Sequence, residues 1–330
     1  MNPRTPRPLP DALSGYAFRT KNAFELGVTP GELQRQEVST ISRGVRAVHK
    51  HESLELAEYF EVAASVVGET LHGVASHITA ARLHDIPLPW RLPSVEKLIS
   101  GRRVRCLVRS VIHVTVPAGQ RTPRRREALG YSKAIQQSEI VDAFGIPTTS
   151  LPRTLLDLTR WLDDHSLVVA LDSLFSGGAR SPKHSKIARL TRAEMQAYLK
   201  GKSGQRGIKR LRFTMDRAVT GADSPPETEL RLALEEADLP PFLANVPVLD
   251  ETGYPVIWPD LSNAEFRVCI EYEGAVHLTP EQLHRDTNRD LRVQMHGWLQ
   301  VRITKIDMKN PHIAVLKVRS ALLRNGWKPN

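Results

Sequence analysis

The stretch from residue 254 to residue 304 constrains the fold more than any other part of the sequence. Two segments with extended character, Val256 to Leu261 and Glu265 to Glu273, flank the dipeptide Ser262-Asn263, which predicts a β-hairpin that turns at this dipeptide. A charged helical run follows, and another extended segment comes after it, from Trp298 to Thr304. Strand, strand, helix and strand in this order predict an α/β domain in this part of the chain.

The second segment of the hairpin carries two acidic residues among apolar ones. Because successive side chains of a strand alternate between its faces, Glu271 and Glu273 project from the same face, roughly 6.5–7 Å apart. The first segment of the hairpin brings Asp260 beside them as a third carboxylate. Neighbouring carboxylates repel one another unless a cation lies between them, and Mg²⁺ or Mn²⁺ prefers oxygen ligands. The pattern favours a metal site over the alternative, an edge strand whose charges face water.

A fourth carboxylate, Glu227, has two roles that the sequence supports equally. Ser224 is a good helix N-cap, Pro225 suits the first helical position, and Glu227 stands where a capping box places its acid. Glu227 also lies three positions before Leu230, on the apolar side of the predicted helix, from which it can point into the metal site.

The charged run predicts a helix from about Pro280 to His296 that ends at Gly297. Three arginines recur along one side of this helix at i, i+4 and i+7, namely Arg285, Arg289 and Arg292. On a lone helix such a ridge is a solvated face paired with acidic neighbours. Beside a carboxylate site the same ridge can hold phosphates.

Taken in order, these residues resemble a known family. Asp260, Glu271-x-Glu273-Gly274, His277, the helix rich in Arg and Asp, and Gly297-Trp298-x-x-Val301-Arg302 are similar to the PD-(D/E)XK endonuclease domain related to very-short-patch-repair enzymes. The resemblance covers about the last third of the chain. It implies a restriction-endonuclease-like α/β domain with a mixed central sheet.

The resemblance also implies roles for individual residues. The family's positions fall on metal-binding Asp260 and Glu271, on catalytic Glu273 and Glu227, and on the accessory residues His277 and Arg302. The family usually has Asp at position 273, and the wider superfamily has Lys there. Because a Glu cannot supply the positive charge of a Lys, activation of the attacking water would rest on the metal ion.

The composition limits the classes of protein that fit. At 330 residues the chain is long enough for two or three domains, and its net charge of +10 favours a polyanionic partner such as DNA. Cys106 and Cys269 are its two cysteines, so we expect neither a four-cysteine zinc site nor a disulfide framework. No apolar signal core and no apolar run of membrane-spanning length is present, which predicts a cytoplasmic protein without a membrane partner.

The N-terminal residues suggest a winged helix-turn-helix. A segment from Phe18 to Val28 reads as a short helix ended by a glycine, and Thr29 to Gln36 reads as a second helix with Pro30 at its first position. The sequence predicts a strand pair through residues 42–45, as in winged helices. The predicted recognition helix offers Arg35 to DNA, and the following segment offers Arg43. The alternative is a plain helical hairpin with a solvated face.

The middle of the chain resembles a second family. The strings SHITAARLHDIPLP, HVTV and IPTTSLPRTLLDL are similar to the regulatory antitoxin of abortive-infection type IV toxin–antitoxin systems. This resemblance covers roughly the first half and implies an N-terminal winged helix that binds its own operator, with a cognate toxin as a possible partner. His77, His84 and His113 are better explained as packing or surface residues than as metal ligands, because nothing in the sequence sets their geometry.

Basic residues are densest between residues 181 and 220, where aromatic residues are scarce. Neutralisation of a nucleic-acid backbone fits this composition better than stacking on single-stranded bases. We therefore predict an α/β multidomain protein with a winged helix-turn-helix at 1–56, an antitoxin-like α/β domain at 57–180, a basic linker at 181–222 and the endonuclease-like domain at 223–330.

Two functions from different classes follow. The first is metal-dependent hydrolysis of DNA by the C-terminal domain. The second is a transcriptional repressor or antitoxin whose C-terminal domain retains the fold of a nuclease without its activity. An RNA-directed nuclease fits as a third possibility, because no feature of the sequence reads a 2′-hydroxyl.

Overall fold

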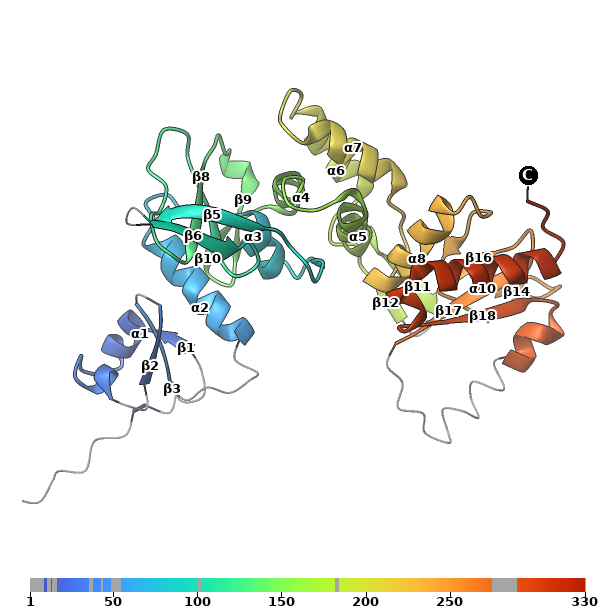
Figure 1. The fold of residues 1–330 in the computed structure, drawn as a ribbon, viewed down its shortest axis with the longest axis horizontal. Coiled ribbons are helices and arrows are strands. Elements are labelled where there is room, and N and C mark those ends of the chain that lie inside the picture. The colour runs from blue at the N-terminus through green and yellow to red at the C-terminus, as the bar shows by residue number, and fades with distance from the viewer. Residues whose placement is uncertain are drawn as a thin grey trace, which may run out of the picture. The chain divides into compact units, whose positions relative to one another are not determined.

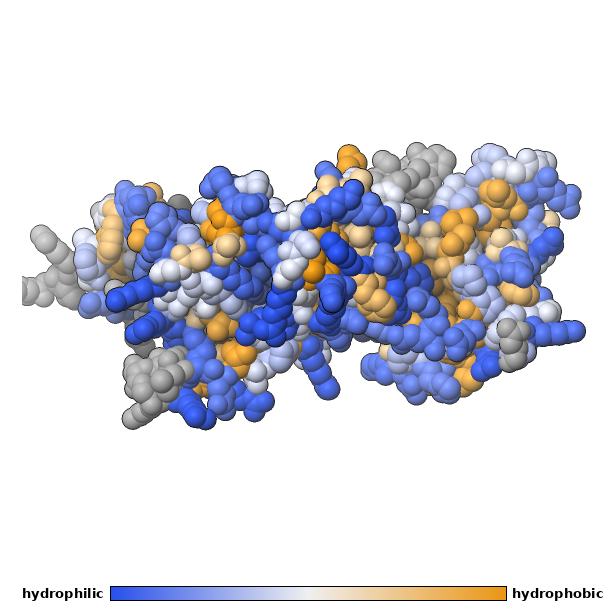
Figure 2. Space-filling view, turned by 90° about the horizontal axis from the view of Figure 1, so that it is seen from above, coloured by the Kyte–Doolittle hydropathy of each residue, from blue (hydrophilic) through white to orange (hydrophobic). Residues whose placement is uncertain are grey.

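The computed structural model describes residues 9–10, 13, 17–35, 38–42, 44–48, 55–99, 102–181, 184–274 and 290–329. The fold is mixed α/β, as predicted, and the chain forms two compact units, Met1–Trp161 and Leu162–Asn330 (Figure 1). On the face that Figure 2 presents, hydrophilic residues predominate and apolar ones form scattered patches. None of the helices in these ranges is both long and apolar enough to span a membrane.

The first part of unit 1 is a small sheet with one helix. It contains β1 (Ala17–Arg19), α1 (Thr20–Glu25), a 3₁₀ turn (Glu32–Gln34), β2 (Val38–Ser42) and β3 (Val45–Val48), and the sheet order is β1-β3-β2. The second predicted helix is thus a single turn. Thr29 N–H donates to the Glu32 carboxylate at 2.8 Å and opens the turn, while Arg35 is already extended and ends it.

The second part of unit 1 is a five-stranded sheet with helices. Its elements are α2 (Glu55–Gly68), β4 (Val74–Ala75), α3 (His77–Leu83), β7 (Ile112–Val116), β8 (Ala128–Ser132), β9 (Ile140–Ala143), β10 (Ile146–Thr149) and α4 (Leu151–Leu158). The strand order is β8-β7-β4-β10-β9, and β5 (Ser94–Ile99) pairs with β6 (Arg102–Leu107) as a separate hairpin. Every residue of β7 is buried, which places this strand at the centre of the core with α2.

Unit 2 begins with helices that include the stretch predicted as a basic linker. Its first elements are α5 (Asp164–Phe175), β11 (Gly178–Ser181), β12 (His184–Lys186), α6 (Arg192–Lys200), α7 (Ile208–Arg217) and α8 (Pro225–Glu236). Met195 and Leu199 of α6 are buried, as are Leu211 and Met215 of α7, which packs against α5. The two compact units divide near residue 161, and these helices belong to unit 2 because they bury apolar faces within it.

A mixed four-stranded sheet forms the rest of unit 2. The strands are β13 (Leu243–Ala244), β16 (Leu261–Asn263), β17 (Val268–Glu273) and β18 (Leu299–Thr304), and the sheet order is β13-β16-β17-β18, with β17 and β18 parallel. Helices α8 and α10 (Pro311–Arg324) pack on one face, where Ile270 and Ile303 join the core (Figure 1). A smaller apolar cluster includes Cys269 and residues of β14 (Val248–Leu249) and β15 (Pro255–Ile257).

Candidate functional site

The hairpin that carries the predicted carboxylates is present, but its turn lies elsewhere. Ser262 pairs with Cys269 and Asn263 with Val268, so both residues of the predicted turn belong to β16, and the chain turns at residues 264–267. The Asn263 side chain accepts the Phe266 N–H at 2.9 Å, and Arg267 has a left-handed φ of 50°. The predicted first segment is also divided, since residues 255–257 pair with β14 as strand β15.

Asp260 is held against the strand that bears the two glutamates. It lies immediately before β16, and its carboxylate accepts the backbone N–H of Tyr272 at 2.7 Å. Its own carbonyl accepts the Asn245 N–H at 3.0 Å, so the residue is fixed from both sides. Tyr272 stands between Glu271 and Glu273 in β17, which brings the three carboxyl-bearing residues to the same part of the sheet. Glu271 and Glu273 are half-buried there.

Arg302 joins Glu273 to a further acid. The parallel register places Arg302 of β18 beside Glu271, and its guanidinium donates to Glu273 Oε1 at 2.7 Å. The same guanidinium binds both oxygens of Asp290 at 2.8 Å. The hydrogen bond to Asp290 is the main reason that the pKa of Arg302 rises further above its usual value, and Glu273 adds to the effect. We call Asp260, Glu271 and Glu273, together with Arg302, the carboxylate cluster.

Glu227 binds the two residues that lead into helix α8. Its carboxylate accepts the Asp223 N–H at 2.9 Å and the Ser224 hydroxyl at 2.8 Å, at the start of α8. The side chain is buried, with 4% exposed. Both donors lie at or before the N-cap residue Ser224, so these bonds fix the chain where it enters α8 and do not satisfy the open N–H groups of the first helical turn. Of the two roles that the sequence supports for Glu227, these contacts belong to the one at the start of the helix.

The predicted nucleic-acid-binding and accessory residues fall only in part within the described residues. Arg43, His277, Arg285 and Arg289 lie outside the described residues. Arg35 is half-buried and pairs with Glu32 at 3.2 Å, in the first unit.

The end of the predicted charged helix is present. Residues 290–295 are helical, Arg292 is exposed there, and Gly297 takes the left-handed φ of 72° that suits a helix C-terminus.

The donor set of the carboxylate cluster suits a hard divalent cation. Among the residues that the structure describes, no three His, Cys, Asp or Glu side chains form a group that could hold a metal ion. Mg²⁺, however, is usually bound by one or two carboxylates, with water and substrate phosphate supplying its other ligands. Asp260 and Glu271 supply carboxylate oxygens at adjoining positions, so these two residues fit Mg²⁺ or Mn²⁺.

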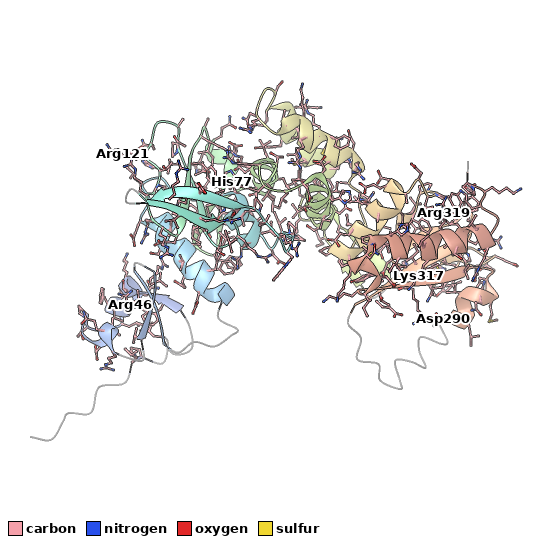
Figure 3. All side chains as sticks on the ribbon, in the orientation of Figure 1. Arg46, His77, Arg121, Asp290, Lys317 and Arg319 are labelled. Atoms are coloured by element: carbon pink, nitrogen blue, oxygen red, sulfur yellow. The ribbon has the colours of Figure 1, made fainter. Side chains whose placement is uncertain are left out.

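A second polar cluster lies in unit 1. The histidine cluster consists of His77, His113, Tyr131, Arg153 and Asp157, all of them buried (Figure 3 labels His77). His77 stacks on Tyr131 with ring centroids 3.8 Å apart, and its Nδ1 lies 2.9 Å from the Ser76 hydroxyl. His113 Nε2 donates to the Val108 carbonyl at 2.9 Å, and its Nδ1 accepts from the Tyr131 hydroxyl at 2.8 Å.

Ion pairs complete the histidine cluster. Arg153 binds Asp157 at 3.1 Å and Glu139 at 3.1 Å, and Lys133 also reaches Asp157 at 3.1 Å. Burial lowers the pKa of His113 to about 4, although its bond to the Val108 carbonyl acts in the opposite direction. Burial also lowers the pKa of His77 well below its usual value, and the charges of His113, Lys133, Arg153 and Arg160 add to the effect.

The two buried histidines are packing residues, whereas His84 is half-buried and lies 2.7 Å from the Thr149 carbonyl. One local pattern in the sequence indicates an ion pair in this cluster. Arg153 and Asp157 stand four residues apart on an otherwise apolar helix, a spacing at which opposite charges meet.

Comparisons with protein-family models, with curated proteins and with solved structures find no match in any of the three.

Proposed function

We propose that the protein binds DNA and that the carboxylate cluster of unit 2 is a metal-dependent site that hydrolyses DNA phosphodiester bonds. The bond from Tyr272 N–H to the Asp260 carboxylate carries this proposal, because it holds Asp260, immediately before β16, beside Glu271 of β17. Oxygen donors at adjoining positions are what a hard cation needs when the substrate phosphate completes its shell. The excess of positive charge, +10 over the chain, favours a polyanionic substrate.

Each residue of the cluster has a part in the proposed reaction. Asp260 and Glu271 would hold the cation, which would supply Lewis-acid polarisation of the phosphoryl group and a more acidic bound water. Glu273 can accept a proton from the attacking water, and Arg302 orients Glu273 through its 2.7 Å hydrogen bond. The phosphorus–oxygen bond to the leaving group then breaks as the bond to the water oxygen forms.

Plasmid cleavage by three matched variants tests the proposal. Asp260→Asn retains an oxygen that can accept the Tyr272 N–H but lacks the charge that binds a cation, and Glu271→Gln makes the same change at its neighbour. We expect both variants to reduce nicking in Mg²⁺ or Mn²⁺ to background while they bind DNA as the wild type does. Glu265→Gln, at an exposed position of the same hairpin, should cut normally. Undiminished nicking by both site variants, or the lack of any nicking by the wild type, contradicts the proposal.

A non-catalytic repressor or antitoxin is the second candidate, and the bonds of Glu273 favour it. Arg302 binds both Glu273 and Asp290, so one carboxylate of the cluster, that of Glu273, is already engaged by a cation of the protein. In this case the cytoplasmic partners are an operator and a cognate toxin, and the first 56 residues supply the sequence-specific contacts. Selection of binding sites from random DNA, with full-length protein, distinguishes the two. A repressor enriches one sequence and leaves it uncut, and the Asp260→Asn variant enriches the same sequence.

A further inference from the structure

β18 is the edge strand of the four-stranded sheet, since within the described chain it pairs with β17 alone. Two backbone bonds set the direction of its groups. Leu299 N–H donates to the Arg267 carbonyl at 2.8 Å, and Lys305 N–H donates to the Glu273 carbonyl at 3.1 Å. Because backbone groups alternate sides along a strand, the N–H and C=O groups of Gln300 face away from β17. Such an edge can pair with another strand.

A groove of about 510 Å³ lies between this edge and helix α10. Its apolar lining comes from Leu299 and Val301 of β18 and from Leu316 and Ala321 of α10. Leu316 is 50% exposed, so the groove presents apolar surface to solvent. The volume falls within the range of roughly 300–1,000 Å³ that is typical of ligand sites. An outward-facing strand edge and an apolar lining therefore meet in one groove.

One exposed cation makes one end of the groove more positively charged than the other. Arg302 and Lys317 also line it, but each is held by carboxylates of unit 2. Arg324 is exposed and forms no ion pair with any other described residue. It stands at the end where β18 begins, because the neighbouring Asn325 donates to the Phe266 carbonyl at 2.8 Å. A ligand with a carboxylate at that end is complementary to the groove.

We propose that this groove binds an extended segment of another protein, which adds to β18 as a further strand. The segment places apolar side chains on the lining at alternate positions and a carboxylate against Arg324. Its backbone bonds to Gln300 supply affinity, and the pockets for alternate side chains supply specificity.

Two other occupants fit the groove less well. A nucleic-acid backbone would meet outward carbonyls and an apolar lining, neither of which favours phosphate. A second copy of the chain that paired through β18 in the antiparallel direction would bring Arg324 towards the Lys317 end of its partner, where another cation stands. An extended peptide with one acidic end can both pair with the backbone of β18 and bind the charge of Arg324.

A random peptide library, panned against the full-length protein, tests the proposal. Gln300→Pro removes one outward N–H, and an edge strand tolerates this change because that N–H does not pair with β17. Gln300→Ala is its matched control, since it loses the same side chain but keeps the N–H. Arg324→Glu reverses the charge of the groove. Its control is Arg319→Glu, because Arg319 lies over the Trp327 ring and leaves α10 on the side away from Lys317 (Figure 3).

We expect the wild type to enrich peptides with alternating apolar residues and an acidic residue at one end. Gln300→Pro should weaken the selected peptides at least tenfold in fluorescence polarisation, and Arg324→Glu should shift the selection to basic ends. Both control variants and Asp260→Asn should bind as the wild type does, which separates this inference from the nuclease proposal. Three results overturn the proposal. They are a wild type that enriches no peptides relative to the Gln300→Pro variant, an Arg324→Glu variant that selects the same peptides as the wild type, or a wild-type dimer that dissociates when Gln300 is replaced by Pro.

Discussion

The two polar clusters of this protein contain similar residue types in very different surroundings. In the histidine cluster, Arg153 and Asp157 have side chains 4% and 3% exposed, and they bind partners that are also inside unit 1. In the carboxylate cluster, the Glu273 and Arg302 side chains are 31% and 33% exposed. Charges that are buried and bonded to one another serve packing and specificity, because no ligand reaches them. Charges at a half-open edge can still meet a cation or a phosphate.

The largest effect that the comparison predicts is the loss of Arg153. Arg153→Met leaves the buried carboxylates of Asp157 and Glu139 without this cation, and breaking a buried pair costs about 3–5 kcal/mol. We expect the free energy of unfolding of unit 1 to fall by that amount, measured by urea denaturation and by amide hydrogen exchange of β7. Arg121→Met, at an exposed arginine of the same unit, should change it by less than about 0.5 kcal/mol. Similar values for the two variants would show that the cluster is not a closed network.

The second effect is a loss of stability in acid. The pKa of His113 is about 4 in the folded protein and 6.5 for an ordinary histidine, so the unfolded state binds a proton first as the pH falls. Stability is therefore complete above pH 6.5 and decreases between pH 6.5 and 4, by about 3 kcal/mol for this residue alone. Burial also lowers the pKa of His77, which acts in the same direction.

Urea denaturation at a series of pH values from 7.5 to 4.5 measures this dependence. The variant His113→Gln has no group to titrate at this position, so its curve should have a smaller slope over the same interval. A wild-type curve that is flat between pH 7 and 5 would show that the histidines are reached by solvent.

The smallest effect on stability belongs to the carboxylate cluster. Glu273→Gln removes one side of an ion pair that is about one-third exposed, and such pairs contribute about 0–1 kcal/mol. We expect little change in the urea midpoint but a fall of at least about tenfold in plasmid nicking, since a proton acceptor near the water is lost. A Glu273→Gln variant that loses stability but keeps its nicking activity would show that this ion pair serves the fold, as the pairs of the histidine cluster do.

Local patterns in the sequence predicted part of this fold correctly. The alternation in residues 268–273 is that of a strand, Ser224-Pro225-x-Glu227 begins a helix, and Gly297 has the left-handed φ expected at a helix end. These features depend on residues within about four positions of one another, through side-chain period and capping. The sequence therefore determined the mixed α/β class and most of the residue types that meet in the carboxylate cluster.

Only the tertiary structure decided how distant residues meet. The hairpin turns at 264–267, where the Asn263 side chain accepts the Phe266 N–H and Arg267 is held at a left-handed φ that its residue type does not favour. The helices of residues 192–217 fold into unit 2 because they bury apolar faces there. The Asp260 bond to Tyr272 and the Arg302 bond to Glu273 depend on strand register across 12 and 29 positions. The burial of His77 and His113 likewise depends on strands far apart in the chain. Such contacts follow from the packing of whole elements, which local periodicity and capping do not specify.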